Sequence, residues 1–261
     1  MGKQPKFDMV TYVVKQELRR FQEFYGKNID FMQRLLTGQD ENGEQVDAPR
    51  TLITPKELAQ IRLGQLGSVN DRLEYRAKPV DTAVAVIPDP SGSEVKYVLN
   101  HPLIATLAKN TKLVKGALPI DQDDYNNHDG FIITGEQADA FKANSNANPD
   151  LRRELFKYLF KYKDLAQEYE EDVIRSLGNP SFDQVMGVYI PDTKGLRLLC
   201  VESIGIYIRS NGNGNYALDY NYGRLVGVAQ EVSVQIDVRG AQRKNGTTPN
   251  IEAVMNQLPK I

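Results

Sequence analysis

The chain has 261 residues, of which 41% are hydrophobic and 25% are charged. This composition is that of an ordinary folded protein and excludes a disordered or membrane-embedded chain. With 32 basic and 34 acidic side chains, the formal net charge is -2, which excludes a global positive field that would recruit nucleic acid. The single cysteine, Cys200, lies in an apolar run, and this position predicts a buried, inert thiol.

Two helices are predicted in the N-terminal part. Apolar residues recur at steps of three or four from residue 10 to residue 36, the pattern of a long amphipathic helix, and Gly38 closes it. Thr54, Pro55 and Glu57 provide the N-cap, the first-turn proline and the capping-box glutamate of a second helix. We expect the two helices to pack together as a helical hairpin.

The middle of the chain predicts a β-hairpin and then a long helix. Two apolar runs between residues 80 and 100 flank a turn from Pro88 to Gly92, which indicates the hairpin. Residues 101 to 120 give no clear element. Asn148 and Pro149 then open a long amphipathic helix that Gly178 and the following residues end.

The C-terminal part predicts an antiparallel meander over residues 184 to 239. A tight turn is expected at Asp192 to Gly195 and a longer one at Ser210 to Asn215. The stretch "EVSVQIDV" at 231 to 238 alternates strictly between apolar and polar residues, as a strand with one buried face does. A short apolar helix is expected at residues 250 to 258.

These elements predict an α+β fold: a helical hairpin and a further long helix packed with an antiparallel β-sheet. We divide it into a helical region (1–78), a mixed hairpin and loop region (79–147), a long helix with the meander (148–240) and a tail (241–261). The alternative is one integrated domain.

The segment from Asp123 to Glu136 resembles an EF-hand calcium loop. Setting Gly130 at position 6 places the oxygen ligands Asn127, Asp129 and Glu136 at positions 3, 5 and 12. Position 1 is Tyr125, a phenol where the pattern has a carboxylate. The resemblance implies a calcium-binding module, and the alternative is a surface turn in which Asn and Asp bond to the local backbone.

A second resemblance is to metal-dependent nucleases of the PD-(D/E)xK type. Pro191 and Asp192 end one predicted strand and Glu202 lies on the next. In that family such carboxylates hold a divalent ion, here Mg²⁺, that activates water. Ile204 stands where the family has a lysine. The resemblance implies a nuclease that uses Asp192 and Glu202 as catalytic residues.

Other chemistry is sparse. His101 and His128 lie 27 positions apart, which gives a shared zinc site only weak support. Arg239, Arg243 and Lys244 form a basic loop that predicts nucleic-acid contact or, alternatively, a solvated loop. Tyr216, Tyr220 and Tyr222 alternate and predict an aromatic face for packing or protein interaction.

We therefore expect a non-enzymatic structural or protein-interaction subunit of a larger assembly, such as a virion or a multisubunit complex. Its expected partners are other protein subunits in an oligomer, with nucleic acid as an alternative and no membrane. No cofactor is expected unless Ca²⁺ or Mg²⁺ binds as above. Residues 1 to 10 have no apolar signal core, and no segment approaches the roughly 18 apolar residues of a bilayer span. This pattern predicts a location in the cytoplasm or within a particle.

Overall fold

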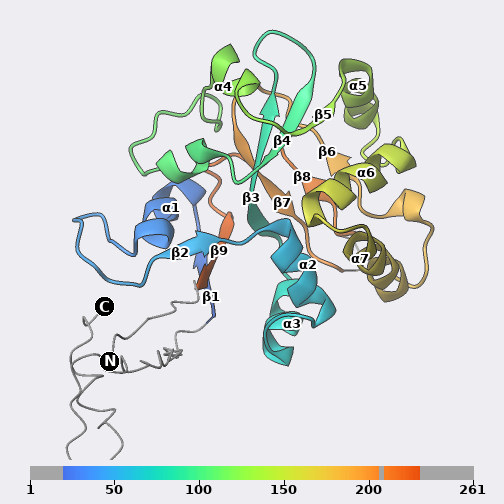
Figure 1. Ribbon diagram of the computed structural model, residues 1–261, viewed down its shortest axis with the longest axis horizontal. Coiled ribbons are helices and arrows are strands. Elements are labelled where there is room, and N and C mark those ends of the chain that lie inside the picture. The colour runs from blue at the N-terminus through green and yellow to red at the C-terminus, as the bar shows by residue number, and fades with distance from the viewer. Residues whose placement is uncertain (1–19, 206–208, 230–261) are drawn as a thin grey trace, which may run out of the picture. The chain divides into compact units, whose positions relative to one another are not determined.

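The computed structural model describes residues 20 to 205 and 209 to 229 of the chain. These residues form seven α-helices, two short 3-10 helices and one mixed sheet of nine strands (Figure 1). The predicted combination of helices with a sheet is confirmed. No helix among these residues has both the length and the apolar character needed to cross a bilayer.

The elements have the following bounds. The strands are β1 (Phe21–Tyr25), β2 (Arg50–Leu52), β3 (Val80–Pro88), β4 (Val95–Leu99), β5 (Phe131–Ile133), β6 (Val188–Tyr189), β7 (Arg197–Val201), β8 (Gly212–Asn213) and β9 (Arg224–Ala229). The helices are α1 (Asn28–Thr37), α2 (Pro55–Leu63), α3 (Val69–Arg76), α4 (Gln122–Asn126), α5 (Gly135–Ala143), α6 (Pro149–Phe160) and α7 (Lys163–Ser176). The 3-10 helices are η1 (Pro102–Thr106) and η2 (Phe182–Gln184).

The sheet has the order β1-β9-β3-β7-β8-β6, with β2 paired to β9, β4 paired to β3, and β5 paired to β4. Two pairs, β3 with β9 and β6 with β8, are parallel, and the others are antiparallel. Strands from each of the three regions predicted before the tail therefore share one sheet.

Strand β3 shows why both faces of the sheet are buried. Val84 and Val86 belong to the core cluster that includes residues of α2, α6 and α7, whereas Ala83 and Ala85 belong to the cluster that includes residues of α1 and η1. Side chains of a strand alternate between faces. A strand covered on both faces is therefore apolar at nearly every position, which explains the continuous apolar run.

Two local predictions are confirmed. Thr54 caps α2, and its hydroxyl accepts a hydrogen bond from the Glu57 N–H while the Glu57 carboxylate accepts one from the Thr54 N–H. Strands β3 and β4 form the predicted hairpin. Both predictions depend on residues that are close together in the sequence, and both elements form at the predicted residues.

The predicted helix over residues 10 to 36 is confirmed only in its last part, from Asn28, and is wrong for residues 21 to 25. Residues 21 to 25 form β1, which pairs along its length with β9, and helix α1 begins only at Asn28. Gly26 separates the two elements with a φ of +138°, a backbone conformation that favours glycine. Gly38 ends α1 as predicted, with a φ of +72°.

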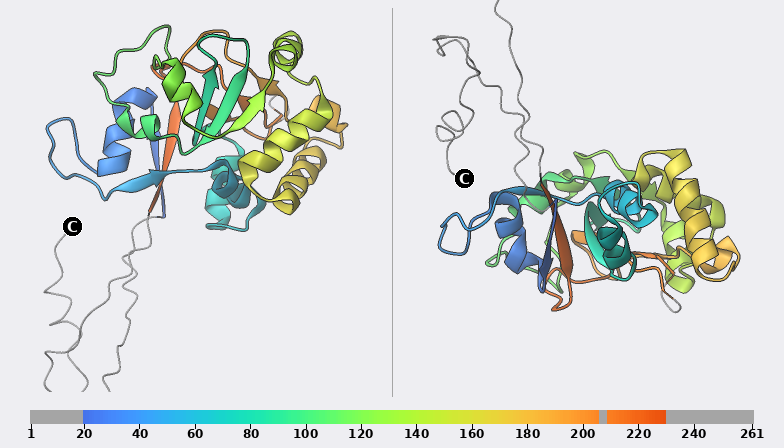
Figure 2. Two further views of the ribbon diagram at one scale, coloured as in Figure 1. Left: turned by 45° about the horizontal axis from the view of Figure 1, so that its top comes forward. Right: turned by 90° about the horizontal axis from the view of Figure 1, so that it is seen from below.

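The predicted hairpin of the first two helices is not confirmed. Helix α1 packs against β2 and β9, whereas α2 packs against α3, α6 and α7. Figure 2 shows α1 and α2 at different parts of the sheet. Each helix therefore buries its apolar residues against a different partner.

The predicted single helix after Asn148 is two helices. Asn148 caps α6, but α6 ends at Phe160, and Lys161 takes a left-handed φ of +63°. Helix α7 then packs back against α6, with the rings of Phe160 and Tyr169 in edge contact at 5.1 Å between centroids. The break lets both helices place an apolar face on the same core, although no glycine or proline marks it.

The predicted meander is not confirmed by the described residues. Strand β3 lies between β9 and β7, so the C-terminal strands are not consecutive neighbours. The longer turn expected at Ser210 to Asn215 contains the buried strand β8, which pairs with β7 and β6. The alternating stretch at 231 to 238 and the helix expected at 250 to 258 lie outside the described residues.

Candidate functional site

Glu202 follows β7 directly and is the most strongly engaged of the predicted site residues. The residue is 9% exposed. It accepts hydrogen bonds from the side-chain amides of Asn211 and Asn213, each at 2.9 Å, and from the Tyr216 phenol at 3.2 Å. Three such donors compensate the loss of water around a buried carboxylate.

The stretch "NGNGN" at 211 to 215 builds this cradle because glycine and asparagine alternate in it. A Cβ on Gly214 would lie 2.9 Å from a methyl carbon of Val86, so only glycine lets the backbone lie this close to the sheet. Asn211 and Asn213 accept backbone N–H bonds through their side-chain oxygens while their amide nitrogens serve Glu202. Each asparagine therefore connects the backbone to the carboxylate.

A fully buried arginine fixes the backbone at the same place. The Arg62 guanidinium donates to the carbonyl oxygens of Glu202 and Tyr75, each at 2.8 Å, and to the Tyr169 phenol oxygen at 2.7 Å. The Ser210 hydroxyl lies 2.7 Å from the same Tyr169 oxygen. Arg62 thereby joins α2, α3, α7 and the end of β7 through polar bonds that satisfy its buried charge.

From Glu202 a row of aromatic rings leads to the surface. The Tyr216 and Tyr220 rings are stacked, 5.5 Å apart at 3° between planes. Tyr222 meets Tyr220 at 5.4 Å, and Tyr25 meets Tyr222 at 6.4 Å. We call Tyr25, Tyr216, Tyr220 and Tyr222 the tyrosine ladder. Its three predicted members lie in a loop and not on a strand, yet their rings gather as expected.

The charges beside the ladder are paired. Arg224 lies over the Tyr25 ring, 5.1 Å from its centroid, and reaches the Glu23 carboxylate at 3.0 Å.

Burial and then the charge of Glu202 raise the pKa of the Tyr216 phenol. That phenol therefore stays protonated and remains a donor to the carboxylate.

Asp192 does not share the environment of Glu202. Asp192 is exposed, and its N–H donates to the side-chain oxygen of Asn215 at 3.1 Å. No contact described for these residues joins Asp192 to Glu202. Among the described residues no group of three or more His, Cys, Asp or Glu side chains is placed to hold a metal ion. The magnesium-dependent nuclease stays a prediction.

Cys200 lies in β7 and is buried, as its apolar surroundings predicted. Burial raises the pKa of its thiol, and the nearby carboxylates of Asp81 and Glu202 raise it further. A thiol in this environment is a poor nucleophile.

The calcium-loop residues lie on three consecutive elements. Asn127 caps the C-terminus of α4, Asp129 precedes β5, and Glu136 lies in the first turn of α5. All three are exposed. The structure does not bring a metal group together in this part of the described chain, and calcium binding stays a prediction.

A lysine already supplies positive charge to this segment. The buried Lys96 ammonium donates to the carbonyl oxygens of Tyr125 at 2.6 Å and His128 at 3.1 Å, and it lies over the Tyr125 ring at 4.1 Å. This contact could not be predicted from the sequence, because Lys96 belongs to β4 and lies 29 residues before Tyr125. The positive charge of the Lys96 ammonium therefore stabilises the turn from Tyr125 to His128.

The fold brings His101 and His128 together, with their ring centroids 4.2 Å apart. His101 is buried, and its Nδ1 accepts the N–H of Leu103 at 3.2 Å. A ring whose Nδ1 accepts a hydrogen bond carries its proton on Nε2 when neutral. A metal at Nε2 would require the proton on Nδ1, facing that N–H, so the contact opposes a shared zinc site.

The basic loop of Arg239, Arg243 and Lys244 lies outside the described residues.

The buried cations Arg62, Lys96 and Arg152 were not predicted as important. One signal was present: Arg62 follows Leu58 by four positions and thus lies on the buried face of α2.

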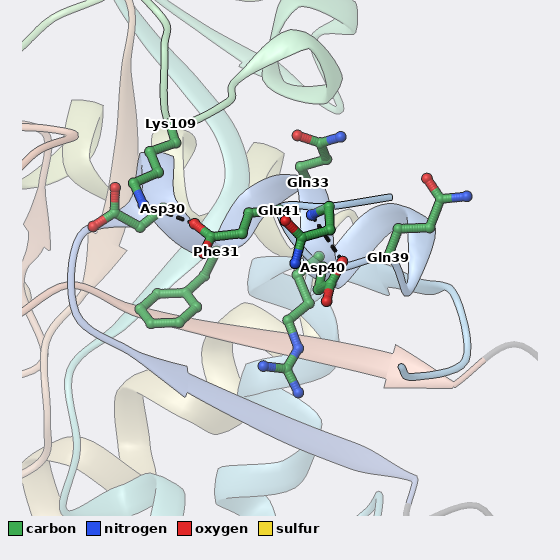
Figure 3. A pocket seen from close by; sticks show the side chains of 9 residues that line it. Asp30, Phe31, Gln33, Gln39, Asp40, Glu41 and Lys109 are labelled. Atoms are coloured by element: carbon green, nitrogen blue, oxygen red, sulfur yellow. Dashed lines mark hydrogen bonds and ion pairs between the residues drawn. The ribbon is translucent and has the colours of Figure 1, made fainter. Parts of the chain in front are cut away.

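A cavity of about 420 Å³ lies beside α1 and the loop that follows it (Figure 3). Lys109 reaches toward Asp30 and Glu41, and its ammonium is 2.9 Å from the Glu41 carboxylate. Both partners of this ion pair are largely exposed, so the pair adds little stability.

Comparisons with protein-family models, with curated proteins and with solved structures found no significant match to this chain.

Proposed function

We propose that the protein is a non-enzymatic subunit whose copies associate through the tyrosine ladder. The observation that carries the proposal is the exposure of three connected rings: Tyr25 is 51%, Tyr220 is 42% and Tyr222 is 62% exposed. Tyrosine is enriched in protein interfaces because its ring offers a large contact area and its hydroxyl keeps a polar contact.

The ladder is ordered before any partner binds. The hydrogen bond to Glu202 fixes Tyr216, and the parallel stack then fixes Tyr220 on Tyr216. Side chains that are already ordered lose little conformational entropy on association. This order supports a binding surface of rigid aromatic anchors.

The charges at the edge of the ladder favour a second copy of the chain over a nucleic acid. Glu23 pairs with Arg224 at 3.0 Å and with Lys78 at 2.8 Å, and Lys78 also pairs with Glu74 at 2.6 Å. The alternating signs suit a self-complementary contact with twofold symmetry. A nucleic acid instead needs cations that are free to neutralise phosphates.

Analytical ultracentrifugation of the full chain tests the proposal. We expect the wild-type protein to sediment as an oligomer at micromolar concentration. Replacing Tyr220 and Tyr222 together by alanine should weaken association by at least about 30-fold, since one central aromatic anchor contributes about 2 kcal/mol. Tyr162→Ala is the matched control, because Tyr162 is 56% exposed and lies on Lys56, away from the ladder.

A wild-type chain that stays monomeric up to millimolar concentration would contradict the proposal. So would a double variant with the sedimentation profile of the wild type. Membership of a virion or of a multisubunit complex is part of the same proposal, and native mass spectrometry of the protein isolated from its source tests it.

A further inference from the structure

Within the described residues the dipeptide Asn-Gly occurs three times, at 42–43, 211–212 and 213–214. Asparagine is chemically labile. A following glycine increases this lability, because glycine has no side chain to keep its main-chain nitrogen away from Cγ of the asparagine. The three dipeptides have the same chemistry, so their surroundings decide which of them reacts.

Asn42 lies in an open turn after α1. The Asp40 carboxylate accepts the backbone N–H groups of Asn42 at 2.9 Å and of Glu44 at 3.0 Å. Gly43 has a φ of +82°, and no atom lies within 4 Å of the position that a Cβ on it would take. Among the described residues no side chain or backbone group forms a hydrogen bond with the Asn42 side-chain amide. Cγ of Asn42 is therefore accessible to the main-chain nitrogen of Gly43.

The side chains of Asn211 and Asn213 are held on both ends. Their amide nitrogens donate to the Glu202 carboxylate, each at 2.9 Å. Their oxygens accept the backbone N–H groups of Gly187 at 2.8 Å and of Asn215 at 2.9 Å. Neither amide can turn toward the following glycine without breaking two hydrogen bonds.

The nitrogens that would attack these two asparagines are also engaged. The Gly212 N–H donates to the Gly187 carbonyl oxygen at 2.8 Å, and the Gly214 N–H donates to the Tyr189 carbonyl oxygen at 2.9 Å. Gly212 and Gly214 are both buried. The Gly43 N–H has a longer bond, 3.1 Å to the Asp40 carbonyl oxygen, in an exposed turn.

We propose that Asn42 is a site of spontaneous deamidation, and that the fold protects Asn211 and Asn213 from the same reaction. The main-chain nitrogen of Gly43 forms a bond to Cγ of Asn42 and loses its proton to water. Nδ2 takes a proton from water, the bond from Cγ to Nδ2 breaks, and ammonia leaves. Water then opens the resulting succinimide at either carbonyl, which gives aspartate or isoaspartate. The reaction consumes only water.

The modification changes the wall of the cavity in Figure 3. Asp30, Asp40 and Glu41 already place three carboxylates there against the cations of Arg34 and Lys109, and Asn42 also lines it. Deamidation adds a further negative charge. Isoaspartate also lengthens the main chain inside the turn that Asp40 holds. The wall of this cavity therefore becomes more negatively charged as the protein ages.

Peptide mapping by mass spectrometry, after incubation of the full chain at mildly alkaline pH and 37 °C, tests the proposal. In the folded protein Asn42 should deamidate at least about tenfold faster than Asn211 or Asn213, because these two react only after local opening. In denaturant the three rates should become similar. In a Glu202→Gln variant the rates at Asn211 and Asn213 should rise while the rate at Asn42 stays the same.

The proposal is overturned if Asn42 stays intact in the folded protein while the denatured chain reacts there. It is equally overturned if Asn211 or Asn213 deamidates in the folded wild type as fast as Asn42. An Asn42→Gln variant is the control for peptide assignment, since glutamine forms the corresponding ring far more slowly.

Discussion

The phenol of Tyr216 donates a hydrogen bond to the carboxylate of Glu202 across 3.2 Å, and this bond joins the buried end of β7 to the exposed rings of the tyrosine ladder. On one side of it lie two asparagine amides, and on the other lies the parallel ring of Tyr220. The order of the surface therefore depends on a polar contact in the interior.

Tyr216→Phe tests this bond while the ring stays in place. We expect a loss of about 1 to 2 kcal/mol in the free energy of unfolding, because a hydrogen bond to a charged group contributes about 1.5 to 3 kcal/mol and this one is partly exposed. Urea denaturation measures it. Tyr222→Phe removes a hydroxyl from an exposed ring and should change stability by less than about 0.5 kcal/mol. Equal losses in both variants would contradict the role given to the bond.

Glu202→Gln tests the asparagine cradle. The new amide has one acceptor oxygen where the carboxylate had two, so its NH₂ group faces an amide donor of Asn211 or Asn213. We expect a loss of about 2 to 3 kcal/mol in the free energy of unfolding. The matched control is Asp192→Asn at an exposed position. A Glu202→Gln variant as stable as this control would show that the cradle is not needed.

Arg62→Met tests the buried guanidinium. Methionine fills much of the same volume but leaves the carbonyl oxygens of Tyr75, Glu202 and others without a donor. We expect a loss of at least about 3 kcal/mol in the free energy of unfolding, given about 1 to 3 kcal/mol for each buried group left unsatisfied. Arg175→Met is the control, because the Arg175 side chain is 72% exposed. A small effect at Arg62 would mean that water replaces the guanidinium.

His101 predicts a pH dependence of stability. Burial lowers the pKa of His101 from its ordinary value of 6.5, the charge of His128 and the ammonium of Lys96 lower it further, and Asp124 acts in the opposite direction. At a pH well above 6.5 His101 is neutral in both the folded and the unfolded state. As the pH falls below that value, the unfolded chain binds a proton that the folded chain does not, so the free energy of unfolding decreases.

A His101→Asn variant isolates this effect, because asparagine can still accept the Leu103 N–H but does not titrate. Denaturation midpoints between about pH 7.5 and pH 5.5 should fall for the wild type and fall less for the variant. The same pH slope in both proteins would remove His101 as the cause.

Local sequence signals predicted local structure well. The Thr54 cap and the β3–β4 hairpin depend on residues close together in the chain, and both formed. The segment from Phe21 to Tyr25 has helical periodicity but forms a strand, because β9, about 200 residues further along, provides its hydrogen bonds. Periodicity within one window contains no information about such a partner.

The candidate site was predictable only in part. The sequence predicts Glu202 as a site residue, whereas Asn211 and Asn213 lie in a glycine-rich stretch that looks like a hairpin tip. Tyr216, Tyr220 and Tyr222 can be predicted to lie together because they are close in sequence. Tyr25 completes the ladder from β1, and only the pairing of β1 with β9 brings it there.

Radical footprinting of the tyrosines over a range of protein concentrations tests the central claim most directly. If copies associate through the ladder, the modification of Tyr220 and Tyr222 should decrease as the oligomer forms, while that of the exposed Tyr162 stays constant. If Tyr220 and Tyr222 remain as reactive in the oligomer as in the monomer, or if no oligomer forms, the tyrosine ladder is not the interface and the proposed function is wrong.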